Sequence, residues 1–517
     1  MSTEINEVWN SRPFDVHLIS DHPSFVSIYE ELMVRFPELD VYVNVPNKGK
    51  KAKGDGRKIF KAVLLDLYVC WCEDSTQWLG ISTNNNSWNT GSRYNYLHIS
   101  RNIKGLLDKL RVLCLIERLN HRHSDIDPRF NHTARYRASS TLRSIFYKHQ
   151  FGIDHVSKAP EREVIVLRKN DVDGFGDDLA SNSPVEYEDT DETVKMRLQV
   201  QAYNELLAKH HIDLGSAQSS RIVISYWDKK LKKRREQKIV IGQHNKFVYR
   251  VFSRGSFDCH GRFYGGWWTR IPSQMRKDIF IDGQPTHEVD FKALHIHLLS
   301  AKSGVRVPAD PYRLPTLVFD DINADTQRKW TKVLILHSIN SKSTKEAFKA
   351  FRHGAKYGDP MKNATDKQLQ LLLSEFIKCY PHLERFLCSD QGIDLMRQDS
   401  DIAAEVIRLM TRQGIPVLCV HDSFIVDAFH WVELREAMTL AALRIAGRDL
   451  LAEQDAFECE RQRGYADYAT EALSCVRNRL ECTQSARRRT HFSGRTMHSV
   501  GFLTKRAQRV GDNNEPG

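Results

Sequence analysis

An aspartate stands in the tight turn of an otherwise apolar segment, GIPVLCVHDSFIVDAFHW, at residues 414–431. The pattern predicts a buried strand, a turn that carries His421, Asp422 and Ser423, and a second strand. An unpaired carboxylate is costly to bury, so this aspartate needs an explanation. A hairpin with a polar tip would explain a lone His-Asp pair. A second carboxylate in a matching position would instead indicate a metal site.

That second carboxylate is Asp290, in the segment PTHEVDFKALHIHLLSAKSG. HEVDF is typical of a buried strand and the residues after it of a helix, so Asp290 is expected at the end of a strand. Two acids held at strand ends can bind two divalent cations about 4 Å apart, which clamp the attacking and leaving oxygens of a phosphoryl transfer. Mg²⁺ suits such a site because it accepts one or two carboxylates and completes its shell with phosphate oxygens and water.

Basic residues that could hold a phosphate lie between and before the two aspartates. In TQRKWTKVLILHSINSKSTKEAF, Arg328 and Lys332 are four apart and therefore share one helical face. Two cations on one face can hold a triphosphate, although most such pairs are only surface charges. Earlier in the chain, SFDCHGRFYGGWWTRIP places Gly261 and Arg262 in a turn that a nucleic-acid strand could approach. An ordinary aromatic-rich hairpin would give the same pattern.

The composition favours a polyanionic partner. Lys and Arg number 76 and Asp and Glu 65 among 517 residues, a positive excess of 11. We expect nucleic acid first and an anionic membrane surface second, but no apolar run approaches the roughly 20 residues that a membrane helix needs. The ten cysteines form no paired C-x-x-C spacing, and no signal-peptide pattern is present. These features predict a cytoplasmic protein of a bacterial or phage-infected cell, with reduced thiols and no membrane partner.

Four motifs follow one another in a fixed order. They are Asp-x-x-Gly-Arg beginning at Asp258, the strand with Asp290, the Arg-x-x-x-Lys helix and the His-Asp-Ser hairpin. This order resembles the phage-type single-subunit RNA polymerases and, more broadly, the palm-and-fingers superfamily that includes the family A DNA polymerases. The resemblance covers residues 245–430. It implies an α+β fold, with a right-hand polymerase palm made of a small antiparallel sheet with helices, and with helical fingers.

The resemblance also implies roles for the residues that carry these motifs. Asp258, Gly261 and Arg262 match the element that contacts the template-product hybrid near the active site. Asp290 matches the first metal-binding carboxylate, and the carbonyl of Phe291 matches an additional ligand.

Further roles follow for the later motifs. Asp422 matches the second metal ligand, and His421 matches a residue near the primer end. Arg328 and Lys332 match the fingers cations that bind the incoming triphosphate, with Lys332 as the acid for the leaving pyrophosphate. Ser423 resembles the RNA polymerase form of the last motif, since the DNA polymerases usually carry Glu there. The implied cofactor is a pair of Mg²⁺ ions, for which Mn²⁺ could substitute.

Two positions of the nucleotide site depart from the family pattern. Asn340 and Ser341 stand where the relatives usually carry a Tyr-Gly pair that takes part in choosing ribose over deoxyribose. His295 stands where the DNA polymerases carry a Glu that excludes the 2′-hydroxyl. The choice between NTP and dNTP therefore stays open.

Changes in composition and in apolar periodicity along the chain predict four parts. Residues 1–150 form an N-terminal helical domain, in which the apolar stripe of 98–119 and the strands after it favour a winged helix over a small helical domain of no special purpose. Residues 151–243 form a linker and a helical thumb-like region, and residues 244–475 form the palm and fingers. Residues 476–517 form a basic tail that is expected to be disordered and to bind phosphate.

These observations predict a template-directed nucleotidyltransferase, most simply a DNA-dependent RNA polymerase or a primase of a mobile element. Its partners would be a DNA template, an RNA or DNA product and nucleoside triphosphates. A DNA polymerase on the same scaffold is the nearest alternative. The other alternative is a non-enzymatic winged-helix replication initiator with a polymerase-like core. Such an initiator is expected to have lost a metal carboxylate or the fingers lysine, whereas Asp290, Asp422 and Lys332 are all present.

Overall fold

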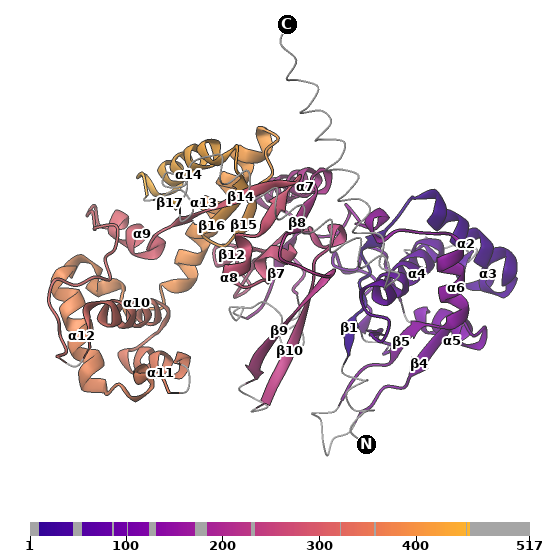
Figure 1. Ribbon diagram of the computed structural model, residues 1–517, viewed down its shortest axis with the longest axis horizontal. Helices are drawn as coiled ribbons and strands as arrows, with labels where there is room; N and C mark the ends of the chain where they lie inside the picture. The colour runs from indigo at the N-terminus through magenta and orange to yellow at the C-terminus, as the bar shows by residue number, and fades with distance from the viewer. Residues whose placement is uncertain are drawn as a thin grey trace, which may run out of the picture.

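The computed structural model divides into two regions that lie side by side (Figure 1). One is an N-terminal region of helices around a small sheet, and the other combines several sheets with a separate group of helices. The residues described are 10–44, 54–84, 87–100, 102–123, 131–170, 184–228, 233–320, 322–355, 358–450 and 452–454. The predicted basic tail lies outside them. No described helix is long and apolar enough to cross a membrane.

The N-terminal region is built on a four-stranded sheet with the order β1-β3-β5-β4. β1 runs parallel to β3, and the other neighbours are antiparallel. The strands are β1 (Ser11–Pro13), β3 (Trp78–Gly80), β4 (Ile116–Leu119) and β5 (Arg135–Ala138). The helices around them are α2 (Pro23–Arg35), α3 (Asp40–Val43), α4 (Gly56–Glu73), α5 (Ile103–Val112) and α6 (Ser140–Lys148).

Apolar periodicity explains the helices that fill this region. Asp55 caps the start of α4, since its carboxylate accepts a hydrogen bond from the backbone N–H of Arg57 at 2.9 Å. The interior of α4 is buried on nearly all sides. α5 buries the stripe predicted from the sequence: Ile103, Leu106, Leu107 and Leu110. The predicted helix and the two strands after it are therefore confirmed as α5, β4 and β5. That they form a winged helix stays a prediction.

The larger region is centred on an antiparallel sheet with the order β15-β16-β14-β13-β8, and β17 also pairs with β14. Its strands are β8 (Ile212–Leu214), β13 (Ile279–Ile281), β14 (Gln284–Phe291), β15 (Leu418–Val420), β16 (Ser423–Asp427) and β17 (Ala452–Gln454). The helices beside it are α8 (Ser273–Arg276), α9 (Leu294–Lys302), α13 (Gly392–Arg412) and α14 (Trp431–Ala446). α14 packs on β14 and β16, and α13 packs against α14 and the neighbouring strand β12. This α+β arrangement has the antiparallel sheet with helices that the sequence predicts.

The segment 151–243, predicted as a linker and a helical region, contains one long helix but also several strands. They are α7 (Asp191–Lys209), β6 (Ser157–Lys158), which pairs with β2 (Leu18–Ile19), β7 (Ile165–Leu167), β9 (Arg221–Asp228) and β10 (Lys233–Val240), besides β8. β7 joins β11 (Tyr249–Phe252) and β12 (His260–Tyr264) in a three-stranded sheet. β7 pairs with β11 and β8 pairs with β13, so these two short apolar strands bind this segment to elements that follow residue 244.

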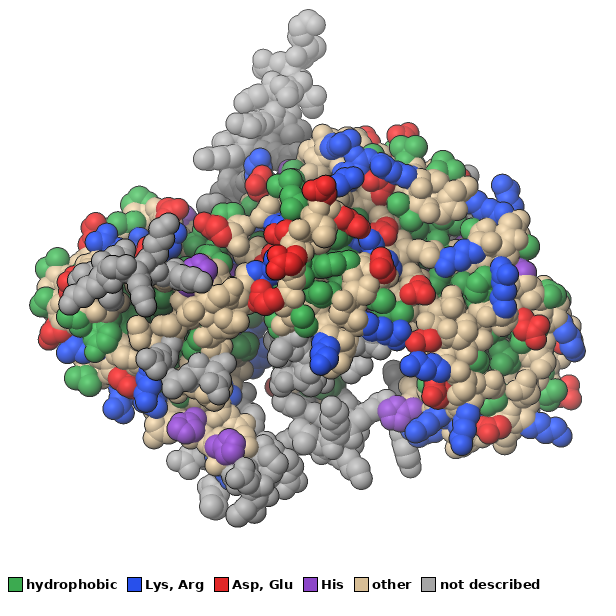
Figure 2. Space-filling view, turned by 180° about the vertical axis from the view of Figure 1, so that it is seen from behind, with side chains coloured by type: hydrophobic (Ala, Val, Ile, Leu, Met, Phe, Trp, Pro, Cys, Tyr) green, Lys and Arg blue, Asp and Glu red, His purple; other side chains and the backbone are tan. Residues whose placement is uncertain are grey.

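A group of helices forms the end of the molecule on the left of Figure 1. They are α10 (Ala324–Asn340), α11 (Thr344–Gly354) and α12 (Asp366–Cys379). The side chain of Asn323 caps α10 by accepting from the backbone N–H of Thr326 at 2.8 Å. Over residues 324–379, Lys and Arg outnumber Asp and Glu by 11 to 5, and Figure 2 shows Lys and Arg side chains spread over this end of the molecule, on the right of that view.

Each of the two regions has its own apolar core. Ion pairs connect the regions where the end of α4 meets β9 and β10. Lys238 and Arg221 both bind the carboxylate of Asp74 at 2.8 Å, and His244 binds Glu73 at 3.0 Å.

Candidate active site

Two aspartates from distant parts of the sequence lie where two paired strands of the central sheet, β14 and β16, come together at their ends. β14 and β16 pair in antiparallel register, with Asp290 opposite Ser423. The backbone N–H of Phe291 donates to the carbonyl of Asp422 at 3.3 Å. Since directly opposite residues in such a ladder lie about 5 Å apart, Asp290 and Asp422 are separated by a single step of the ladder. The structure thus makes the backbones of the two predicted aspartates neighbours.

The turn between β15 and β16 holds Asp422 in place. His421 adopts a left-handed conformation with a φ of 60°, which is uncommon for a residue other than glycine. Val420 pairs with Ser423 across the turn, and the Ser423 hydroxyl donates to the carboxylate of Glu288 at 2.6 Å. The predicted strand, turn and second strand are therefore confirmed as β15, the turn and β16, and the turn is fixed from both strands.

Electrostatics make Asp422 a carboxylate that favours a nearby cation. Burial raises the pKa of Asp422, and the negative charge of Asp399 raises this pKa further. Arg262 and His295 lower the pKa but do not cancel the increase. A carboxylate that has lost its water and faces a second negative charge gains more from a bound cation than an exposed one does.

Asp399, on α13, is a buried carboxylate of the site that was not predicted from the sequence. Its carboxylate accepts from both ends of the Arg262 guanidinium, at 3.1 Å for Nε, and interacts with Nε2 of His295 at 2.9 Å. Asp399 is only 2% exposed. Burial alone would raise its pKa, but the charge of Arg262 and the hydrogen bonds from His295 and Arg262 outweigh burial and hold the pKa of Asp399 below its ordinary value.

The Asp-x-x-Gly-Arg motif forms the turn before β12 and its first residues. Asp258 is exposed in the turn, and Arg262 is bound to α13 rather than free for a nucleic-acid strand. Gly261 has a φ of +78°, and an added Cβ would lie 2.8 Å from both Phe252 and Ser400. Only glycine therefore lets β12 approach α13 closely enough for the Arg262 contact.

A neutral histidine lies beside the aspartate pair. Burial lowers the pKa of His421 to about 4, and the charge of Arg262 contributes to this decrease. Its Nδ1 is buried and has no hydrogen-bond partner in the described part of the chain. The ring of Tyr264 meets His421 edge-on with centroids 6.1 Å apart, and His260 stacks on Tyr264. At neutral pH the imidazole adds no positive charge and can still form a hydrogen bond.

The predicted phosphate-binding cations lie on α10. Arg328 pairs with Asp310 at 2.5 Å, whereas Lys332 is exposed and makes no ion pair with any described residue. Burial raises the pKa of Tyr312, and the charges of Asp310 and Asp422 raise it further, while Arg328 acts in the opposite direction. Tyr312 is therefore within electrostatic range of both Arg328 on α10 and Asp422.

Asn340 and His295, the two residues considered for sugar selection, have different surroundings. Asn340 ends α10, where its side chain donates to the carbonyl of Leu336 at 2.7 Å. A Cβ at Gly392 would lie 1.8 Å from Asn340 Oδ1, so the amide packs closely on the first residue of α13. His295 is bound to the buried Asp399. The charge of His295 also lowers the pKa of Asp422.

The donor set fits Mg²⁺ better than a metal that needs many side chains. The described residues contain no cluster of three His, Cys, Asp or Glu side chains placed to hold a metal. Zn²⁺ needs three or four side-chain ligands, whereas Mg²⁺ takes one or two carboxylates and keeps several waters. Asp290 and Asp422, with the carbonyl of Phe291, would supply the smaller set.

Comparison with known proteins gives distant similarity to solved structures only. No protein-family model matches the chain, and no curated protein matches it. Among solved structures, the chain is similar to the POL domain of Pol1 from M. smegmatis in complex with DNA primer-template and dNTP, at 9% sequence identity and a TM-score of 0.29. This similarity covers 88% of the chain and 69% of that domain. Because a similarity at this level does not carry a function from one protein to another, we derive the function from the residues of the site.

Proposed function

We propose that the chain is a template-directed nucleotidyltransferase that joins nucleotides with two Mg²⁺ ions, most simply a DNA-dependent RNA polymerase or a primase. The observation that carries this proposal is the pairing of β14 with β16. This pairing makes Asp290, near the end of β14, and Asp422, just before β16, neighbours. A carboxylate pair of this kind suits a phosphoryl transfer assisted by two divalent cations. The basic helices α10–α12 supply positive charge for a triphosphate.

The residues of the site have distinct tasks in this reaction. Asp290 and Asp422, with the Phe291 carbonyl, would hold the two Mg²⁺ ions, for which Mn²⁺ could substitute. When bound, the ions supply the charge that stabilises the attacking and leaving oxygens. His421 offers a neutral hydrogen-bonding group where the 3′-terminal nucleotide binds, and Lys332 neutralises the triphosphate and protonates the leaving pyrophosphate.

The N-terminal region binds duplex DNA in this proposal. A winged helix places its second helix in the major groove and its hairpin on the backbone. α5 presents the exposed cations Lys104 and Arg111, and the β4–β5 hairpin follows directly. This order of a helix and a hairpin supports the proposal.

Extension of single-stranded DNA tests the function. NTPs and dNTPs are supplied in separate reactions with Mg²⁺, with and without a primer. We expect RNA product, and RNA without a primer would indicate priming or transcription. DNA product alone would assign the chain to the DNA polymerases. An absence of product in every reaction, with tight duplex binding retained, would contradict the proposal and favour a replication initiator.

Replacing Lys332 by alanine tests the fingers helix. We expect Lys332→Ala to slow nucleotide incorporation by about 100-fold, as the loss of a general acid does, and to raise the KM for the nucleotide. The matched control is Lys329→Ala, because Lys329 is exposed on the same helix but pairs with Asp359 at 3.6 Å. Equal incorporation rates in both variants would show that Lys332 does not contact the triphosphate.

A further inference from the structure

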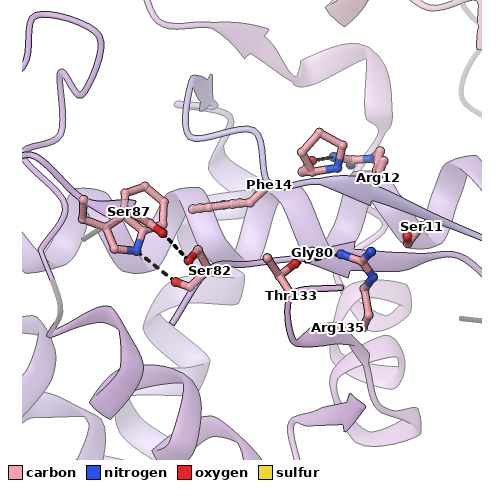
Figure 3. Close-up of a pocket in the computed structure, with 10 residues that line it drawn as sticks. Ser11, Arg12, Phe14, Gly80, Ser82, Ser87, Thr133 and Arg135 are labelled. Atoms are coloured by element: carbon pink, nitrogen blue, oxygen red, sulfur yellow. Dashed lines mark hydrogen bonds between the residues drawn. The ribbon is translucent and has the colours of Figure 1, made fainter. Parts of the chain in front are cut away.

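A pocket of about 390 Å³ opens on the sheet of the N-terminal region (Figure 3). Its walls come from β1 and the residue after it, from β3 and the loop that follows, and from the start of β5. Its volume falls within the range typical of small-ligand sites. The aspartate pair lies in the other region, so the pocket is a separate site.

The wall of the pocket carries a cation without an acidic partner among the described residues. Arg135 donates from Nη1 to the hydroxyl of Thr133 at 2.8 Å, and its Nε is buried without a hydrogen-bond acceptor in the described part of the chain. Burial lowers the pKa of Arg135, with no carboxylate to oppose it. The other arginine of the wall, Arg12, is paired with Asp66 and Glu73. An anion in the pocket would therefore bind Arg135.

A glycine makes room for this guanidinium. Gly80, on β3, pairs with Arg135 on β5. A Cβ at Gly80 would lie 2.3 Å from Nη1 of Arg135 and 3.3 Å from Oγ1 of Thr133. The missing side chain lets the guanidinium lie across the strand at the pocket, where a larger residue would displace it.

Flat apolar surfaces and hydroxyl groups line the rest of the pocket. Phe14 and Trp88 are both only partly buried, and the indole N–H of Trp88 donates to the carbonyl of Ser82 at 2.9 Å, which fixes the ring. The hydroxyls of Ser82 and Ser87 are hydrogen-bonded to each other at 2.7 Å. In Figure 3, Phe14 lies between this serine pair and the side chain of Arg135. An unpaired guanidinium beside aromatic rings matches a phosphate that is followed by a base.

We propose that this pocket binds one nucleotide unit of a single nucleic-acid strand, with the phosphate on Arg135 and the base against Phe14 and Trp88. Proteins that bind single strands combine positive charge along the backbone with aromatic side chains on which bases stack. A free mononucleotide has the same phosphate and base, so the test compares both sources. The proposal rests on the nucleic-acid binding of the proposed function but not on its chemistry, and binding is measured without nucleotide addition.

The test is fluorescence anisotropy of the full chain with a short labelled oligothymidylate, and with dTMP as a separate ligand. We expect Arg135→Gln to weaken oligonucleotide binding about fivefold or more and to reduce the slope of log K against log salt concentration by about 0.7, the value for one phosphate of a single strand. Phe14→Leu removes the stacking surface and is expected to weaken binding by a similar factor without a change of slope.

Controls separate the pocket from general effects. Arg35→Gln, at an exposed position on α2, is expected to leave affinity and slope unchanged. Thr133→Val, at an exposed position, removes the hydroxyl that orients Arg135 and is expected to weaken binding, which keeps the test informative if Arg135→Gln does not fold. Asp422→Asn is expected to bind normally, whatever its activity.

Two outcomes would overturn the proposal. Wild-type affinity and slope in both Arg135→Gln and Thr133→Val would exclude the phosphate contact. A loss of dTMP binding with unchanged oligonucleotide binding would assign the pocket to free nucleotides and not to a strand.

Discussion

Asp422→Asn is expected to lose at least about 1,000-fold in the rate of nucleotide addition and to keep its stability. An amide is a weak ligand for Mg²⁺, and the two metal ions contribute several kcal/mol of transition-state stabilisation. The effect of Asp422→Asn on folding stability has a separate cause. Because the pKa of Asp422 is raised in the folded chain, folding is penalised as the pH rises through that pKa, and asparagine removes the penalty. Asp290→Asn is expected to lose activity to the same extent.

Extension assays and thermal unfolding at pH 7 together check this prediction. Asp394→Asn is the matched control, since Asp394 is exposed on α13 and forms no ion pair with a described residue. We expect near wild-type activity in the control and an unfolding temperature in Asp422→Asn that is equal to or above wild type. Retained activity in Asp290→Asn or Asp422→Asn would exclude the two-metal site.

The second large effect is expected at Asp399, and it concerns stability. Asp399→Asn leaves Arg262 and His295 in a partly buried site without the negative charge that both contact. Removing one partner of a buried ion pair typically costs 3–5 kcal/mol, and we expect a decrease of about 3 kcal/mol in the free energy of unfolding at pH 7. Urea unfolding measures this decrease, and Asp394→Asn, on the same helix, is expected to change it by less than about 1 kcal/mol.

The pH dependence distinguishes this ion pair from a packing effect. The pKa of Asp399 is lowered on folding, so its contribution is fully present above the unfolded value of about 4 and is lost as the pH falls through the folded pKa. The difference between Asp399→Asn and wild type is therefore expected to shrink below pH 4. A difference that is independent of pH would show that the variant only disturbs packing.

Local patterns predicted the elements of the site because each element is set by its own residues. The alternation in HEVDF gave β14, the apolar runs around His421 gave the β15–β16 hairpin, and the spacing of apolar residues gave α5. Asp290 and Asp422 were singled out because a carboxylate between apolar residues conflicts with the pattern around it. In these segments the local pattern of apolar residues determines both the secondary structure and which side chains are buried.

Partners that are distant along the chain were not predictable in the same way. The pairing of Arg262 with Asp399 depends on how closely β12 packs on α13, which no local spacing encodes. One signal was present: Asp399 falls on the buried stripe of α13, in line with Leu395, Ile402 and Val406. An acid on an apolar stripe indicates a buried partner, although it does not identify that partner. β7 and β8 were missed because runs of three residues carry too little periodicity.

The separate apolar cores of the two regions affect how cooperatively the protein unfolds. A continuous apolar core makes a chain unfold in one step, whereas partly exposed ion pairs such as Lys238–Asp74 and Arg221–Asp74 are weakened by salt. Ionic strength therefore acts on the coupling between the regions more than on either core. As this coupling weakens, we expect the two regions to unfold less cooperatively, so that a single melting temperature describes the protein less well at high salt.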